Sequence, residues 1–325
     1  MEKTALVTVF FGGMHELRRR ATLRALQSWD EQEYKPDEAV FLELVCPGEL
    51  PCFSEKDMPE WLRYLRLYGE DRNKGIFQKE AMWNLSVKYL NADKLMFIDS
   101  DTIAIDNPRH FKLLYNASSP GKCIHVAEKI LVEAPDGSVK TRWSEFSPRK
   151  DRETAFPGLG FVLNRNDLLD IDGFNPYSVT SCGDDVFLYE VVRKVRSRFW
   201  KSTRFLYGVA RKNLMQLEPM CVENTTTMHM NHNRPDEVRV DRHVINAVVE
   251  LCGLPQSYVH LDPSGLVAWN DPQGLPRHII CGVGGCKSRD EVKARISGIV
   301  SGRLDELQQS WGQGHESERP FNTVL

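Results

Sequence analysis

The sequence predicts an α/β protein in which helices flank a mixed, mostly parallel sheet. Short apolar segments of strand length alternate with longer segments of helical periodicity, which is typical of parallel sheets covered by helices. Two carboxylates directly follow one of the short segments, and ligands of open α/β sheets bind at the carboxyl ends of strands. The 325 residues, 41% of them hydrophobic, are enough to form a sizeable core.

Four strands and two helices are predicted in the first third of the chain. The strands are continuous apolar runs, as expected when both faces of a sheet are buried. The helices show apolar residues every three or four positions. The strands are Ala5–Phe11, Glu38–Cys46, Tyr64–Tyr68 and Lys94–Ile98, and the helices are His15–Trp29 and Ile76–Leu90.

The remainder of the chain is less regular. Pro135-Asp136-Gly137 predicts a tight turn and therefore a hairpin of Lys129–Glu133 with Val139–Trp143. After Gly253, four prolines interrupt any long element. We therefore predict one domain over residues 1–253 and a partly irregular C-terminal extension over 254–325. Further strands are predicted at Gly158–Asn164 and Thr225–Asn231, and further helices at Asp184–Val195 and Asp236–Leu251.

Charge and composition narrow the class of protein. A formal net charge of −3 argues against a surface that neutralises phosphate throughout, although Arg18, Arg19 and Arg20 form a local basic cluster. The chain has no apolar run long enough to span a membrane, and its first residues lack the features of a signal peptide. We expect a cytoplasmic protein whose eight scattered cysteines are reduced thiols.

Asp99 and Asp101 form the first candidate site. They lie two residues apart at the end of the strand Lys94–Ile98, so both side chains can point the same way and serve one divalent cation. An ordinary solvated turn after a buried strand is the alternative. The apolar residues on both sides of the pair favour the metal, because a cation offsets the repulsion between two partly buried carboxylates.

A second candidate site contains further acids and histidines. Asp184 and Asp185 precede a predicted helix, where one acid can cap the helix and the other can face a cleft. We expect Asp185 to be a catalytic base and Asp184 a cap or an acceptor contact. His229 is our first choice and His232 our second for an imidazole ligand, since Mn²⁺ accepts mixed carboxylate and imidazole coordination. A structural role for the two histidines is the alternative.

These motifs together resemble the family 2 glycosyltransferases and their GT-A relatives, including the polypeptide N-acetylgalactosaminyltransferase and galactosyltransferase groups. The resemblance covers about residues 4–245. It implies a Rossmann-like GT-A fold with a nucleotide-sugar-binding half, 1–105, and an acceptor and catalytic half, 106–253. The motifs, in order, are Val7–Phe11, Asn73-Lys-Gly75, Phe97–Asp101, Gly158–Phe161, Gly173-Phe174, Gly183–Asp185 and His229-x-x-His232.

The resemblance also implies roles for individual residues. Asp101 would bind Mn²⁺ or Mg²⁺ directly, and Asp99 would contact the metal or the ribose of the donor. Asp185 matches the family's base, and His229 matches its late metal ligand. Val45-Cys46-Pro47-Gly48 stands where family 2 members carry an acidic turn that reads the nucleobase, so a UDP-sugar is favoured only by the habit of the family. The residues implied to line the donor are Phe10, Phe11, Gly75, Lys79, Asp99 and Gly158.

The resulting hypothesis is a metal-dependent, inverting glycosyltransferase of the hexosyltransferase type. Its partners are a nucleotide-sugar donor and an acceptor hydroxyl on a glycan, a small molecule, a protein or a modified nucleic acid. Two alternatives stay open: a nucleotidyltransferase that uses paired aspartates with divalent metal, and a catalytically silent module that binds sugar nucleotides or glycans.

Overall fold

The computed structural model describes most of the chain. The described ranges are 2–13, 15–105, 107–134, 136–151, 155–156, 158–177, 216–230, 251–253, 255–283 and 288–312, with residues 244, 248 and 286. The predicted helix Asp184–Val195 lies outside these residues, as does nearly all of Asp236–Leu251.

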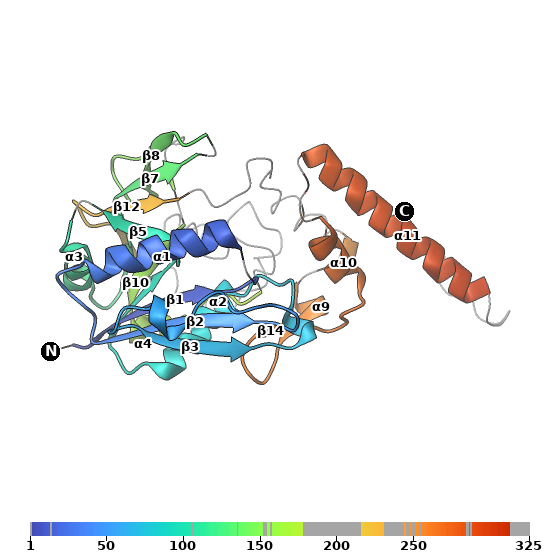
Figure 1. Ribbon diagram of the computed structural model, residues 1–325, viewed down its shortest axis with the longest axis horizontal. Helices are drawn as coiled ribbons and strands as arrows, with labels where there is room; N and C mark the ends of the chain where they lie inside the picture. Colours follow the sequence, from blue (N-terminus) through green and yellow to red (C-terminus); the bar gives the residue numbers. More distant parts are fainter. Residues whose placement is uncertain are drawn as a thin grey trace.

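A mixed, mostly parallel sheet of seven strands forms the centre of the fold, as predicted (Figure 1). β10 is the antiparallel strand, pairing in that sense with both β4 and β6. The spatial order is β11 (Glu218–Met220), β6 (Lys122–His125), β10 (Gly160–Asn164), β4 (Lys94–Ile98), β1 (Thr4–Phe10), β2 (Glu38–Val45) and β3 (Arg63–Tyr68).

Hydrophobic cores cover both faces of this sheet. In β1, Ala5 and Val7 belong to one buried cluster and Leu6 to the other, because successive side chains of a strand point to opposite faces. α2 covers the first face, and α1 and α3 cover the second. These helices are α1 (Glu16–Asp30), α2 (Lys79–Ser86), which continues into η3 (Val87–Tyr89), and α3 (His110–Ala117).

Two predicted elements begin later than expected. The helix predicted from Ile76 begins at Lys79, and Gly75 before it has φ +77°. The strand predicted from Gly158 begins at Gly160, after Leu159 with φ +91°. A leucine at positive φ interrupts a strand, whereas Gly160 tolerates its own φ of +129° at the start of β10 because it has no Cβ atom. Short elements η1 (Glu55–Asp57), η2 (Asp71–Asn73) and α4 (Arg165–Asp170) complete this part of the chain.

A second, smaller sheet packs beside α1. The Trp29 indole of α1 donates to the Thr102 carbonyl (2.9 Å), and the Ala104 amide donates to the Ser28 hydroxyl (3.0 Å). The predicted hairpin of β7 and β8 is confirmed within this sheet. Its strand order is β5 (Thr102–Ile105), β12 (Thr226–His229), β7 (Lys129–Glu133), β8 (Val139–Ser144) and β9 (Ala155–Phe156).

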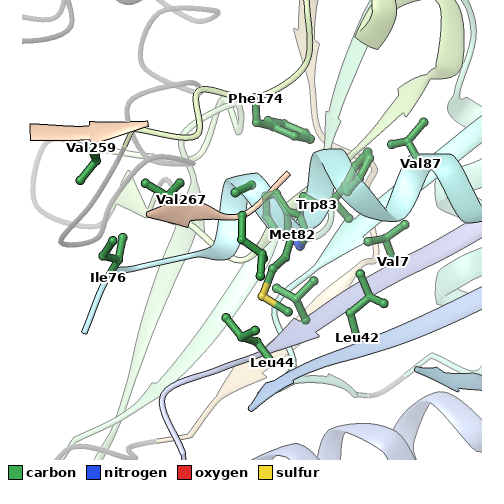
Figure 2. Packing of buried hydrophobic residues seen from close by; sticks show 14 of the residues in the cluster. Val7, Leu42, Leu44, Ile76, Met82, Trp83, Val87, Phe174, Val259 and Val267 are labelled. Atoms are coloured by element: carbon green, nitrogen blue, oxygen red, sulfur yellow. The ribbon is translucent and has the colours of Figure 1, made fainter. Parts of the chain in front are cut away.

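The elements after residue 253 pack on the first core. Val259 and Val267 are buried in the same cluster as Val7 and Trp83 (Figure 2). Ile279 belongs to this cluster as well. The boundary that we placed at residue 253 stays a prediction. The elements are α9 (Pro255–Tyr258), the hairpin of β13 (Val259–Leu261) and β14 (Val267–Trp269), α10 (Leu275–Gly282) and α11 (Arg289–Gly312).

Candidate functional site

The acidic pair lies at the carboxyl edge of the central sheet. β1 and β4 run parallel, so the loop after Phe10 and the turn after Ile98 lie at the same edge. The Thr102 amide donates to the Asp99 carbonyl (3.0 Å), which closes the turn between β4 and β5. Both acids therefore lie where open α/β sheets bind their ligands.

Lys79 is the first cation beside this pair. Its Nζ lies 2.8 Å from Asp99 Oδ1, and it stands 4.9 Å from the centre of the Trp83 ring. The Lys79 side chain is 11% exposed and that of Asp99 is 21% exposed, so solvent screens this pair less than it screens a surface pair. Lys79 is the first residue of α2, which places its ammonium at the sheet edge.

His229 reaches the second acid from the smaller sheet. β12 pairs antiparallel with β5, and this register sets His229 opposite Thr102, the residue after Asp101. His229 Nε2 lies 3.6 Å from Asp101 Oδ2, longer than a hydrogen bond. Both side chains are partly exposed, at 13% and 15%. An imidazole nitrogen and a carboxylate oxygen thus face one another at the surface of the site.

Arg18 is a site residue that the sequence did not single out. Its guanidinium donates to the Phe11 carbonyl (2.8 Å) and stacks 4.6 Å from the centre of the Phe10 ring. Burial lowers the pKa of Arg18 below its ordinary value, and the nearby Asp101 and Asp99 carboxylates oppose that shift. The arginine lies in the first turn of α1. The helical period is the signal that separates its direction from those of Arg19 and Arg20, its neighbours in the basic cluster.

A strained stretch of backbone at Leu159 lies against the acidic pair. The Asp99 amide donates to the carbonyl of Leu159 (2.9 Å), a buried leucine with φ +91°. Such a backbone costs about 1–3 kcal/mol and persists only where its surroundings hold it. His125 contributes to that hold, because its Nε2 lies 2.6 Å from the Gly158 carbonyl oxygen. At Gly160 (φ +129°), a Cβ atom would lie 2.0 Å from the Phe97 carbonyl oxygen.

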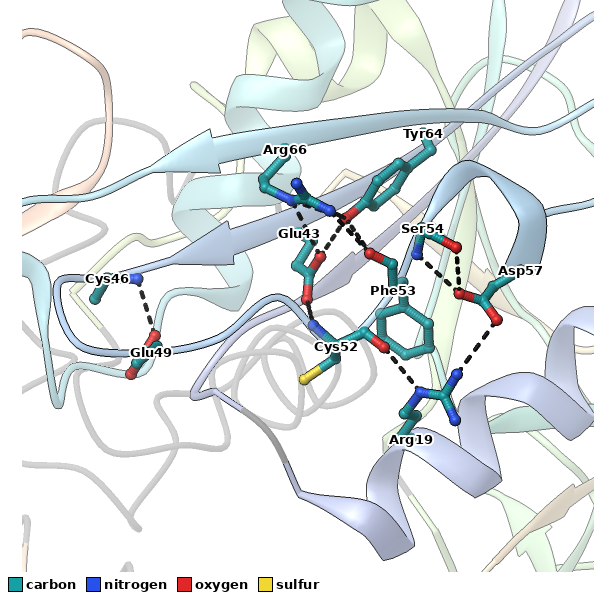
Figure 3. Close-up of polar contacts among 10 residues, drawn as sticks. All are labelled: Arg19, Glu43, Cys46, Glu49, Cys52, Phe53, Ser54, Asp57, Tyr64 and Arg66. Atoms are coloured by element: carbon teal, nitrogen blue, oxygen red, sulfur yellow. Dashed lines mark hydrogen bonds and ion pairs between the residues drawn. The ribbon is translucent and has the colours of Figure 1, made fainter.

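The loop after β2 is held by a buried carboxylate (Figure 3). Glu43 accepts hydrogen bonds from the Cys52 amide (2.5 Å) and the Tyr64 hydroxyl, and lies 3.7 Å from Arg66 Nε. On the far side of the loop, Arg19 donates to the Cys52 carbonyl (2.8 Å). Glu43 therefore anchors the loop after β2 at Cys52.

The structure brings together much of the predicted site. Asp99 pairs with Lys79, and Asp101 faces His229. Arg18 contacts Phe10 and Phe11, and the charges of both acids act on its pKa.

Other predicted residues lie elsewhere. Gly158 lies in the strained stretch at Leu159. Gly75 faces α10, where a Cβ atom would lie 2.5 Å from Cys281 Sγ. Asp184, Asp185 and His232 lie outside the described residues. Among the residues that the structure does describe, no group of three or more metal-ligating His, Cys, Asp or Glu side chains occurs. The described helices include none that is long and apolar enough to cross a membrane.

Comparisons with known proteins find similarity in solved structures alone. No family model matches the chain, and no curated protein does. A structure of S. aureus TarS residues 1–349 is 12% identical with a TM-score of 0.42, covering 70% of this chain and 60% of that one. The same fragment in complex with UDP is 11% identical with a TM-score of 0.42, over 75% and 62%. In complex with UDP-GlcNAc it is 12% identical with a TM-score of 0.41, over 77% and 67%.

Proposed function

We propose that the protein is a glycosyltransferase that transfers a sugar from a nucleotide-sugar donor to an acceptor hydroxyl. The observation that carries the proposal is the meeting of Asp101 with His229 and of Asp99 with Lys79 at the carboxyl edge of the sheet. A nucleotide diphosphate presents negative charge, which the two basic side chains Lys79 and Arg18 complement. The ordered series of motifs that resembles family 2 glycosyltransferases supports the same activity.

The donor atoms of the site fit a divalent cation. Asp101 Oδ2 and His229 Nε2 come from adjacent strands, and their 3.6 Å separation is one that two ligands of a single ion can span. Mn²⁺ accepts this mixed set, and Mg²⁺ is commonly held by one or two carboxylates together with substrate phosphates. We assign Asp101 and His229 as the metal ligands. Asp99, which already holds Lys79, is assigned to the donor or to the metal.

A bound cation would offset the negative charge that develops on the departing diphosphate. In the proposed reaction, the acceptor oxygen bonds to the anomeric carbon as the bond from that carbon to the diphosphate breaks. The electron pair of the broken bond leaves with the nucleoside diphosphate. Asp185, which we assign from the sequence, takes the proton of the acceptor hydroxyl. The acceptor oxygen attacks from the face opposite the leaving group, and this attack inverts the configuration. Lys79 and Arg18 hold the diphosphate in place.

The aromatic end of β1 supplies the lining of the donor site. Phe11 packs edge-on against Phe77 (5.0 Å between ring centres), and Arg18 stacks on Phe10. We propose that Phe10 and Phe11 line the nucleotide and that Gly158 borders the transferred sugar. Gly75 is assigned to the donor side through the segment that leads to Lys79.

Calorimetric titration of a panel of nucleotide sugars, with and without Mn²⁺, tests this function. Urea denaturation gives a second readout: with metal, a donor present at 100 times its Kd should raise the free energy of unfolding by about 2.7 kcal/mol, and the same donor concentration without metal should raise it less. In Asp101→Asn the metal should no longer strengthen donor binding. Asp136→Asn, which removes a carboxylate from the exposed turn before β8, is the matched control and should behave as the wild type.

Three results would count against parts of the proposal. Donor binding that is equal with and without metal, in both the wild type and Asp101→Asn, would refute the metal assignment. Product analysis separates the alternatives, since a glycosyltransferase releases a nucleoside diphosphate whereas a nucleotidyltransferase releases pyrophosphate. If the protein binds donor but turns over none with any of a panel of acceptors, the alternative of a catalytically silent binding module is favoured.

A further inference from the structure

The segment before α2, residues 73–78, is clamped by the hairpin of β13 and β14. Gln78 is 1% exposed, and its side-chain amide pairs with both backbone groups of Val267. Its Nε2 donates to the Val267 carbonyl (2.7 Å), and its Oε1 accepts from the Val267 amide (2.9 Å). A side-chain amide offers one donor and one acceptor in the arrangement of a peptide group, so Gln78 completes β14 as a neighbouring strand would.

Three further contacts tie the same two segments together. Asn73 Nδ2 donates to the Val267 carbonyl (3.0 Å) and to Asp262 Oδ2 (2.9 Å), and the Trp269 indole donates to the Lys74 carbonyl (3.1 Å). Ile76, Val259 and Val267 belong to one hydrophobic cluster, where Figure 2 shows the hairpin beside α2. Most of these hydrogen bonds are buried, so breaking one costs more free energy than breaking an exposed hydrogen bond would.

Lys79 directly follows this clamp. The residue is the first of α2, and its position depends on where the preceding backbone enters the helix. That backbone has an unusual path, because Gly75 has φ +77° and packs against Cys281 of α10. A lysine side chain has four rotatable carbon–carbon bonds, so the position of its Cα decides which rotamers can reach Asp99 at 2.8 Å.

We infer that Gln78 is a positioning residue for the donor site, through which the C-terminal hairpin holds Lys79 against Asp99. The inference rests on the proposed function for the meaning of Lys79, and it assigns the backbone of Val267, through its pairing with Gln78, to the support of donor binding. This role concerns donor binding, because the hairpin contacts the segment that leads directly into Lys79.

The test replaces Gln78 with methionine, which keeps the length of the side chain and removes both polar groups. The first measurement is the rate of reductive methylation of Lys79, followed by peptide mass spectrometry and normalised to the exposed Lys88. In the wild type Lys79 should react slowly, because its ammonium is paired and 11% exposed. In Gln78→Met the rate should rise by about threefold or more, since the ion pair is no longer held.

The second measurement is steady-state kinetics with the nucleotide sugar that the titrations identify. Gln78→Met should raise KM for the donor by roughly tenfold and leave kcat within about twofold, since only donor binding is weakened. Gln78→Glu keeps the acceptor for the Val267 amide but sets a buried carboxylate oxygen against the Val267 carbonyl, so it should raise KM at least as much as Gln78→Met does. That variant also serves if Gln78→Met does not fold.

His260→Ala is the matched control. It removes a hydrogen bond to Asn270 Oδ1 (2.7 Å) within the same hairpin and leaves the contacts of Gln78 intact. It should leave both the methylation of Lys79 and KM unchanged. If Gln78→Met lowers Tm yet Lys79 reacts at the wild-type rate, Gln78 is merely structural and the inference is overturned. Methylation needs no donor, so it decides the inference even if no sugar nucleotide binds and the proposed function fails.

Discussion

Replacing Gly160 with alanine should destabilise the protein far more than the same change at another glycine of positive φ. At φ +129° an alanine backbone is strained by about 1–3 kcal/mol. The new Cβ would also lie 2.0 Å from the Phe97 carbonyl oxygen and 2.9 Å from the Ile98 Cα, whereas real Cβ contacts are essentially never under 3.0 Å. β4 and β10 would have to separate, which costs about 1 kcal/mol for each hydrogen bond lost.

The expected loss in the free energy of unfolding is therefore about 3 kcal/mol or more, measured by urea denaturation. Gly121→Ala is the control, because Gly121 has φ +80° and a Cβ atom there would meet no other atom within 4 Å, so it should lose only about 1–2 kcal/mol. Equal losses in the two variants would refute the close approach of β10 to β4. Since the Asp99 amide bonds to the Leu159 carbonyl, Gly160→Ala should weaken donor binding as well.

Two further outcomes concern titrating groups. Burial lowers the pKa of His110 to about 4. As the pH falls, the imidazole is therefore protonated in the unfolded chain before it is protonated in the folded protein. The free energy of unfolding should fall by about 3 kcal/mol between pH 6.5 and pH 4. His110→Gln should flatten that slope in urea titrations, and an unchanged slope would contradict the assignment. Burial, reinforced by the Glu43 carboxylate, raises the pKa of Cys52 to about 11. Glu43→Gln should therefore speed alkylation of Cys52 at a pH of about 8.5 by roughly severalfold relative to Cys46, and an unchanged ratio of the two rates would argue against it.

The sequence predicted the central strands well because their signal is local. A strand buried on both faces is a short apolar run, and Lys94–Ile98 has the predicted bounds. The hairpin of β7 and β8 was also predicted from its turn residues. The beginnings of α2 and β10 were wrong by three and two residues. At β10 the reason is Leu159, whose positive φ no apolar pattern reveals.

The sequence by itself determined the acidic pair and the strand that carries it, since both lie within one short segment. Only the tertiary structure decided what surrounds that pair. Strand pairing between β5 and β12 brings His229 to Asp101, and the start of α2 brings Lys79 to Asp99. Arg18 joins them because β1, which leads into its helix, runs parallel to β4. These contacts join residues that are far apart in the chain. They form only when the intervening loops close, and loop closure leaves no periodic pattern in the sequence.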